Sequence, residues 1–258
     1  MDKEKITALG FRFGKLSTHT SRTIMLAELS ALLSHTSKNA SKAQYLKAIS
    51  EENVLGKSTI TNRKLTAERL SALYALDSAV CIFRVMRSLW YLDEVSRPLL
   101  AFYCACARDN LLRASVEVIL SLQPGEKINT VYMENYLESV FPQRFSNAMR
   151  RSLAQNINSS WTQAHYLSGK VTKKRVHPHV TPINVAYALL LAFLEGARSQ
   201  RLFEGFWAQL LDLPKEKIHE LAFAASQRGL LDYKSAGGVI EVRFPDLLTP
   251  KEQEVLLE

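Results

Sequence analysis

The sequence lacks long apolar runs and contains few cysteines. No stretch approaches the ~20 consecutive apolar residues that a membrane-spanning helix needs, and the longest candidate, residues 185–194, fits a buried helix better. The three cysteines, Cys81, Cys104 and Cys106, are an odd number in a chain that opens without a recognisable signal peptide. All three lie in apolar helical stretches, so we expect small core residues in a cytoplasmic protein.

The familiar catalytic and metal-binding signatures are also missing. Ser168-Gly169-Lys170 stands alone and is not a phosphate-binding loop, and there is no GxSxG nucleophile turn. His177-Pro178-His179 has no nearby Cys, Asp or Glu to complete a metal site, and Cys104-x-Cys106 lacks partners for zinc. Asp93-Glu94 fits a helix end better than a catalytic pair. We therefore expect no enzymatic activity, no metal and no cofactor.

Acidic residues are absent from residues 144–175, which hold seven Lys or Arg. The net charge of +8 is unevenly distributed: +5 over residues 1–80, +5 over residues 131–180 and −3 over residues 181–258. Clustered Lys and Arg favour a polyanionic partner, because their binding to phosphates releases counterions. Nucleic acid is the first partner that this pattern indicates.

The acid-free segment has the periodicity of a helix. Its apolar positions recur on one face: Phe145, Met149, Leu153 and Ile157. Pro142 stands where a helix can begin, and an earlier helical pattern covers residues 131–140. Trp161 and residues 165–169 read as a strand that leads into a tight turn. Helix, turn, basic helix and hairpin is the order of a winged helix-turn-helix, whose second helix enters the DNA major groove.

The rest of the chain is also predicted to be mostly helical after a loose start over residues 1–9. Hydrophobic periodicity, caps and breakers predict helices over residues 20–34, 42–50, 59–76, 78–91, 98–122, 183–197, 202–213 and 215–228. Residues 230–244 read as a β-hairpin around Gly237-Gly238. The predicted fold class is mainly α, a helical bundle with helix-turn-helix or winged-helix-like units and short β-hairpin wings.

Breaks in the pattern suggest three domains. Residues 1–77 form an N-terminal helical unit with a helix-turn-helix-like pair, and residues 78–180 a helical core that carries the basic winged-helix-like unit. Residues 181–258 form a C-terminal winged-helix-like unit, opened by Thr181-Pro182.

A set of short motifs runs through residues 10–170. They are GFRFGKL at 10–16, Glu28 in the helix that follows, ISEENVL at 49–55, TNRK at 61–64, ERL at 68–70, RRSL at 150–153, and Trp161 with LSG at 167–169. In these motifs the chain resembles the BrxA family of bacteriophage-exclusion (BREX) defence systems. The resemblance implies a small, mostly helical, cytoplasmic DNA-binding component of a multi-protein phage-defence system. Residues 181–258 extend beyond it.

These patterns predict three groups of double-stranded DNA contacts. The basic helix would meet the major groove and its backbone through Arg144, Asn147, Arg150, Arg151 and Gln155. The hairpin would contact phosphates through Lys170, Lys173, Lys174 and Arg175. The N-terminal unit would add a second contact through Arg63, Lys64 and Arg69.

Two other functions remain open from the sequence. The acidic residues 181–258, with the aromatic side chains of Phe203, Phe206 and Trp207, could dock another protein of a complex, and the chain would then be an adaptor. Basic helical bundles also bind RNA, as antitermination proteins do.

Overall fold

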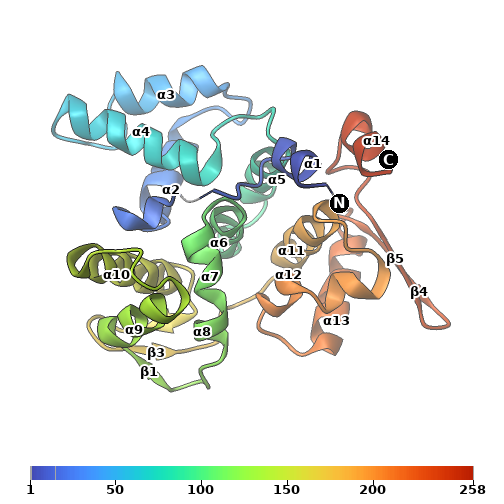
Figure 1. Ribbon diagram of the computed structural model, residues 1–258. Helices are drawn as coiled ribbons and strands as arrows, with labels where there is room; N and C mark the ends of the chain where they lie inside the picture. Colours follow the sequence, from blue (N-terminus) through green and yellow to red (C-terminus); the bar gives the residue numbers. More distant parts are fainter. Residues whose placement is uncertain (1, 15, 258) are drawn as a thin grey trace.

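The chain is described here by a computed structural model that covers residues 2–14 and 16–257, without the side chains of Val255 and Leu257. Met1 of the expected loose start and Lys15 of the GFRFGKL motif lie outside the described residues. The fold is mainly helical and carries two small antiparallel sheets (Figure 1), which confirms the predicted fold class.

The N-terminal part begins with a helix where a loose start was expected. Its elements are α1 (Lys3–Ala8), the 3₁₀ turn η1 (Thr18–Thr20), α2 (Leu26–His35), α3 (Lys42–Ser50) and α4 (Ile60–Tyr74). Asp2 caps α1 by accepting a hydrogen bond from the Glu4 amide. The predicted helix over residues 20–34 starts only at Leu26, because Met25 adopts a left-handed conformation with φ 53°.

The apolar middle of the chain forms four helices, whereas its periodicity predicts two. It forms α5 (Cys81–Trp90), α6 (Arg97–Arg108), α7 (Asn110–Ala114) and α8 (Val116–Leu120). The single helix predicted over residues 98–122 is therefore wrong. Asp109 breaks it by adopting extended backbone angles and capping α7 through the amides of Leu111 and Leu112.

The basic segment forms a helical pair bound to a three-stranded sheet. Its elements are β1 (Lys127–Ile128), α9 (Thr130–Val140), α10 (Asn147–Gln163), β2 (Leu167–Ser168) and β3 (Lys173–Arg175), with strand order β1-β3-β2. The basic helix begins after Ser146, which caps it, and not near Pro142. Trp161 belongs to α10 and is buried, so its assignment to a strand is wrong. The short strand β1 was not predicted.

The C-terminal part repeats the order of helices followed by a hairpin. It contains α11 (Pro182–Leu194), η2 (Ser199–Phe203), α12 (Phe206–Gln209), α13 (Lys215–Gln227), β4 (Asp232–Ala236), β5 (Val239–Arg243) and α14 (Pro250–Leu257). The helix expected over residues 202–213 is split between η2 and α12. The hairpin is confirmed, and its two turn residues, Gly237 and Gly238, have φ 57° and 82°, as a two-residue turn of type I′ requires.

One buried cluster of apolar side chains runs through all three predicted domains. Helix α11 packs against α5 and α6 as well as against α12 and α13, and Figure 1 shows it between these pairs. The Tyr187 hydroxyl on α11 donates to the Ile82 carbonyl on α5 at 2.9 Å. The predicted boundaries after residues 77 and 180 therefore do not interrupt the core. Within the described part of the chain, no helix combines the length and apolarity required to cross a membrane.

Candidate nucleic-acid interface

Helix α10 buries one face and exposes another. Leu153, Ile157 and Trp161 point into the core, whereas Asn147, Arg151 and Gln155 are exposed at four-residue intervals. The helix contains no acidic residue, and among the described residues Arg151 has no ion-pair partner. The surface of α10 that a ligand can reach is therefore the exposed stripe of Asn147, Arg151 and Gln155.

Arg150 is held within the protein. Its guanidinium donates to a carboxylate oxygen of Glu138 on α9 and, through Nη2, to Asn147 Oδ1 at 2.9 Å. A hydrogen bond from the Gln143 amide and the Arg150 charge lower the pKa of Glu138. The ion pair between Arg150 and Glu138 cannot be seen from residues 144–175 alone, because Glu138 belongs to the preceding helix. Arg150 therefore joins α9 to α10, so its guanidinium is less available for the predicted DNA contact than an exposed, unpaired cation would be.

Arg144 lies in the turn between α9 and α10. Its guanidinium carbon is 5.1 Å from the ring centroid of Phe141 and 5.0 Å from that of Phe145, both within the range of a cation–π interaction. The two rings are themselves 6.2 Å apart and nearly perpendicular. The turn thus presents a cation supported by aromatic rings at the start of the exposed stripe.

The loop between β2 and β3 is an exposed wing that depends on Gly169. Gly169 has φ +106°, and a Cβ there would lie 2.6 Å from the Thr172 carbonyl oxygen. The next two residues, Lys170 and Val171, are exposed, and Val171 reaches 87% exposure. Lys174 is exposed on β3. The wing therefore carries Lys170 and Lys174 into solvent.

Two of the predicted wing cations are not accessible. Arg175 is 2% exposed; it pairs with Asp212 at 2.6 Å and donates to the carbonyls of Ile119, Tyr166 and Val176. Lys173 is 9% exposed and reaches back to the Gly169 carbonyl, and its burial lowers the pKa of the amine. Strand alternation directs these two side chains inward and Lys174 outward, so their predicted phosphate contacts are wrong.

A cation that the sequence did not single out joins the wing surface. Lys127 on β1 stands directly opposite Lys174 on β3 in the strand register, and both side chains are exposed. Neither has an ion-pair partner among the described residues. Periodicity could not reveal Lys127, because a two-residue strand is too short to show alternation.

The C-terminal hairpin has the opposite charge arrangement. There the register places Asp232 opposite Arg243 and Lys234 opposite Glu241. The preceding helix, α13, carries Lys217 paired with Glu220 at 2.7 Å. The C-terminal hairpin therefore places opposite charges across its strands, whereas the β1-β3 pair places Lys127 opposite Lys174.

The N-terminal basic residues lie on α4, which begins after its Thr59 cap. Lys64 is exposed, while Arg63 and Arg69 are partly buried, and Arg63 Nε donates to the Lys57 carbonyl at 3.3 Å. Arg22, expected within a helix, lies instead in the extended segment before α2 and donates to Asn62 Oδ1 of α4 at 3.4 Å. No pattern along the chain could place Arg22 beside α4, because the contact joins residues 40 positions apart.

The segment of residues 17–26 connects α4 to α10. On the α10 side, Ser160 Oγ accepts from the Ile24 amide, and Gln163 Oε1 from the Leu26 amide. On the α4 side, the Tyr74 hydroxyl donates to the Ile24 carbonyl. Both basic helices are therefore fixed to the same short stretch of backbone.

A buried polar network secures this stretch. His19 Nδ1 lies 3.0 Å from Asp109 Oδ2, and His19 Nε2 lies 2.9 Å from Ser160 Oγ. Burial alone would raise the pKa of the Asp109 carboxyl. The adjacent His19 and hydrogen bonds from Ser17 and the Leu112 amide outweigh it, and the pKa falls to about 2.

Asp109, His19 and Ser160 have the order of a hydrolase triad. Here Ser160 Oγ donates to the Asn156 carbonyl and accepts from the Ile24 amide, and the residue is 0% exposed. The geometry accounts for packing between η1, α7 and α10. It leaves no path by which a substrate could reach the Ser160 hydroxyl.

The aromatic residues expected to dock a protein partner are mostly internal. Phe203 and Trp207 are buried, and Phe206 packs beneath Arg113, whose guanidinium carbon is 4.2 Å from its ring centroid. The described residues contain no cluster of His, Cys, Asp and Glu suited to a metal ion. His177 pairs with Asp212 at 2.7 Å.

A comparison of the chain with protein-family models and with curated proteins finds no match.

Proposed function

We propose that this protein is a non-enzymatic double-stranded DNA-binding protein whose contact surface is the outer face of α10 together with the β1-β3-β2 wing. The surface consists of Arg144, Arg151, Gln155, Lys127, Lys170 and Lys174. Among the described residues, Lys127, Arg151, Lys170 and Lys174 are exposed and have no ion-pair partner, and these four cations carry the proposal, because such a cation gains most from an external phosphate.

The contrast between the two winged-helix-like units supports this choice. In the first unit two lysines face each other across neighbouring strands, which costs stability. In the second unit the register places an acid opposite a base at two positions, Asp232 opposite Arg243 and Lys234 opposite Glu241. A polyanion would neutralise the two opposed lysines of the first unit, whereas in the second unit acids already lie opposite the bases.

The N-terminal helix α4 gives the proposal a second contact. Because residues 17–26 bind both α4 and α10, the two basic helices have a fixed separation. We infer that Lys64, Arg69 and Arg63 touch the same duplex as the wing, with Arg22 between the two surfaces.

The surface favours binding with low sequence selectivity. Most of its side chains are cations, which contact phosphates and position a protein without reading bases. Asn147 Oδ1 is already engaged by Arg150, which leaves Gln155 as the amide best placed for a bidentate contact with adenine.

The resemblance of residues 10–170 to the BrxA family suggests where such binding would operate. We propose that the protein serves as a DNA-binding component of a BREX-like phage-defence system in the bacterial cytoplasm, where the acidic C-terminal part would meet other proteins of the system.

The test is fluorescence anisotropy with a labelled duplex at physiological salt, using Arg151→Glu combined with Lys174→Glu. We expect the affinity to fall at least about tenfold, because two phosphate contacts become repulsive. The matched control is Arg201→Glu combined with Lys217→Glu, which changes the net charge equally but alters exposed cations of the C-terminal part. This control should bind within about twofold of wild type.

Equal affinity of the two double variants would contradict the proposal, because binding would then follow net charge alone. A parallel titration with duplex RNA of the same sequence distinguishes the RNA-binding alternative. If neither nucleic acid binds to the folded protein, the chain is better explained as an adaptor.

A further inference from the structure

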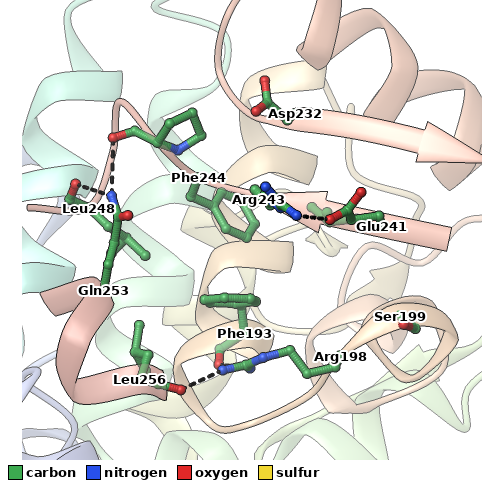
Figure 2. Close-up of a pocket in the computed structure, with 12 residues that line it drawn as sticks. Phe193, Arg198, Ser199, Asp232, Glu241, Arg243, Phe244, Leu248, Gln253 and Leu256 are labelled. Carbon is green, nitrogen blue, oxygen red and sulfur yellow. Dashed lines mark hydrogen bonds and ion pairs between the residues drawn. The ribbon is translucent and has the colours of Figure 1, made fainter. Parts of the chain in front are cut away.

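The C-terminal part contains a cavity that DNA binding does not use. It has a volume of about 530 Å³ and lies between β5, the end of α11, the start of η2 and α14. This volume falls within the range of roughly 300–1,000 Å³ that is usual for small-molecule sites. In Figure 2 its labelled lining residues come from these four elements, from Asp232 at the start of β4 and from the segment between β5 and α14.

The inner wall of the cavity is apolar. Phe193 and Phe244 pack edge to face with ring centroids 5.3 Å apart, and Leu248 and Leu256 complete the wall beside α14. Apolar walls of this kind hold the hydrocarbon part of a ligand, because binding removes it from water.

The side chain of Arg198 lies at one edge of this apolar wall. The guanidinium carbon of Arg198 lies 3.7 Å from the Phe193 ring centroid. Its Nη1 donates to the carbonyls of Phe193 and Ala197, each at 2.8 Å, and its Nη2 to the Leu256 carbonyl at 3.3 Å. Among the described residues, no carboxylate pairs with Arg198.

Arg198 is half-buried, and its burial lowers the pKa of the guanidinium. A partly desolvated cation that has only neutral acceptors gains from an anionic partner. The other lining cation, Arg243, is already paired with Glu241 on the same strand (Figure 2). The unpaired positive charge of the cavity is therefore located at Arg198.

We propose that this cavity binds an amphipathic carboxylate, with its apolar chain or ring against Phe193, Phe244 and Leu256 and its carboxylate at Arg198. Asp232 and Glu241 lie across the cavity near β5. Their negative charges disfavour the reverse orientation and direct the carboxylate toward Arg198.

The ligand would also stabilise α14. Leu256 both lines the cavity and supplies the carbonyl that Arg198 binds. A molecule that fills the space beneath α14 therefore adds contacts to a helix that the ion pair between Arg84 and Glu252 and the hydrogen bond from Arg198 also hold.

The experiment compares three probes of equal chain length on the full-length protein by isothermal titration calorimetry below their micellar concentrations. The probes are decanoate, decan-1-ol and decylamine. We expect saturable one-to-one binding of decanoate that is roughly 10-fold or more tighter than binding of the alcohol, the effect of one charge-assisted hydrogen bond. The amine should bind most weakly.

Two pairs of neighbouring variants locate the site. Arg198→Gln should abolish the preference for decanoate over the alcohol, whereas Arg201→Gln, an exposed neighbour outside the lining, should keep it. Ser199→Trp should fill the mouth of the cavity and weaken all binding, whereas Gln200→Trp, exposed and outside the lining, should not.

The absence of saturable binding, or equal affinity for the three probes, would overturn the proposal. So would decanoate binding unchanged in Arg198→Gln and Ser199→Trp. If Arg198→Gln loses its cooperative thermal transition, the Ser199 and Gln200 pair and the wild-type ranking of probes still decide the outcome.

Discussion

Lys127 and Lys174 occupy directly opposed positions on β1 and β3, and both side chains point into solvent. Like charges in such a cross-strand pair lower stability. The C-terminal hairpin of the same chain places an acid opposite a base at both comparable positions. Of these two sheets, the one with the unfavourable pair is therefore the one that we propose to contact DNA.

Lys127→Glu should raise stability and weaken DNA binding at the same time. The introduced carboxylate would face Lys174 and replace repulsion with attraction, so the free energy of unfolding should rise by roughly 0.2–1 kcal/mol. DNA affinity should fall several-fold, because a phosphate contact is lost and a negative charge is added. Urea unfolding and duplex anisotropy measure the two effects separately.

The control for this variant is Lys234→Glu in the other hairpin. It places a second carboxylate opposite Glu241 and should lower stability without changing DNA affinity. A Lys127→Glu protein that is more stable and binds DNA as wild type does would remove the sheet from the interface.

The adjacent arginines of α10 should behave differently. Arg150→Ala breaks the link to Glu138 and should lower mainly the free energy of unfolding. Arg151→Ala removes an exposed cation and should lower mainly DNA affinity. Chemical denaturation and anisotropy on both variants test this separation, and the reverse pattern would mean that Arg150 leaves Glu138 to bind DNA.

Arg175→Gln should destabilise the protein by about 3 kcal/mol or more, because it leaves Asp212 without its buried partner. The salt dependence of the remaining DNA binding should not change. The neighbouring Lys174→Gln should keep or slightly raise stability, because it relieves the repulsion from Lys127, and it should flatten the salt slope by about one unit. If Arg175→Gln flattens the slope while stability is kept, Arg175 is accessible in solution.

Asp109 should make stability depend on acid pH. Its folded-state pKa of about 2 lies below the ordinary value of 3.8, so the ionised form stabilises the native state. This contribution is complete well above the ordinary pKa, disappears as the pH falls through the folded-state pKa, and amounts to about 2 kcal/mol. Unfolding midpoints measured between about pH 2 and pH 5 should show the loss in wild type. Asp109→Asn should flatten this limb, whereas the exposed Asp246→Asn should not.

The salt dependence of binding tests whether α4 and the wing grip one duplex. About six to eight phosphate contacts predict a slope of log K against log salt of roughly −5 to −7. Alanine at Arg63, Lys64 and Arg69 should flatten the slope by up to about three units. Identical slopes for this variant and for wild type would place α4 away from the DNA and make it a candidate protein-binding surface.

Several local features of this fold follow from short-range chemistry and could be predicted from the sequence, with the cap of α4 expected at Ser58 or Thr59. Ser41 caps α3 with Gln44 in a capping box, Thr59 caps α4, and the Gly237-Gly238 turn closes the C-terminal hairpin. Each depends on residues a few positions apart, where side chain and backbone interact without help from the rest of the chain. Net charge and the absence of acidic residues from residues 144–175 are counts along the chain, so they could also be read from the sequence.

Whether a given cation is exposed or buried, and whether it is paired, depends on the tertiary structure. Arg150 forms an ion pair with Glu138 across the connection between α9 and α10, and Arg175 forms one with Asp212 of the C-terminal part. Lys174 lies opposite Lys127, which belongs to a strand too short for periodicity to reveal. A charge pattern along the chain cannot report partners that arrive from elsewhere in space. Burial and pairing are properties of the packed molecule, because they depend on which distant segments the common core brings together.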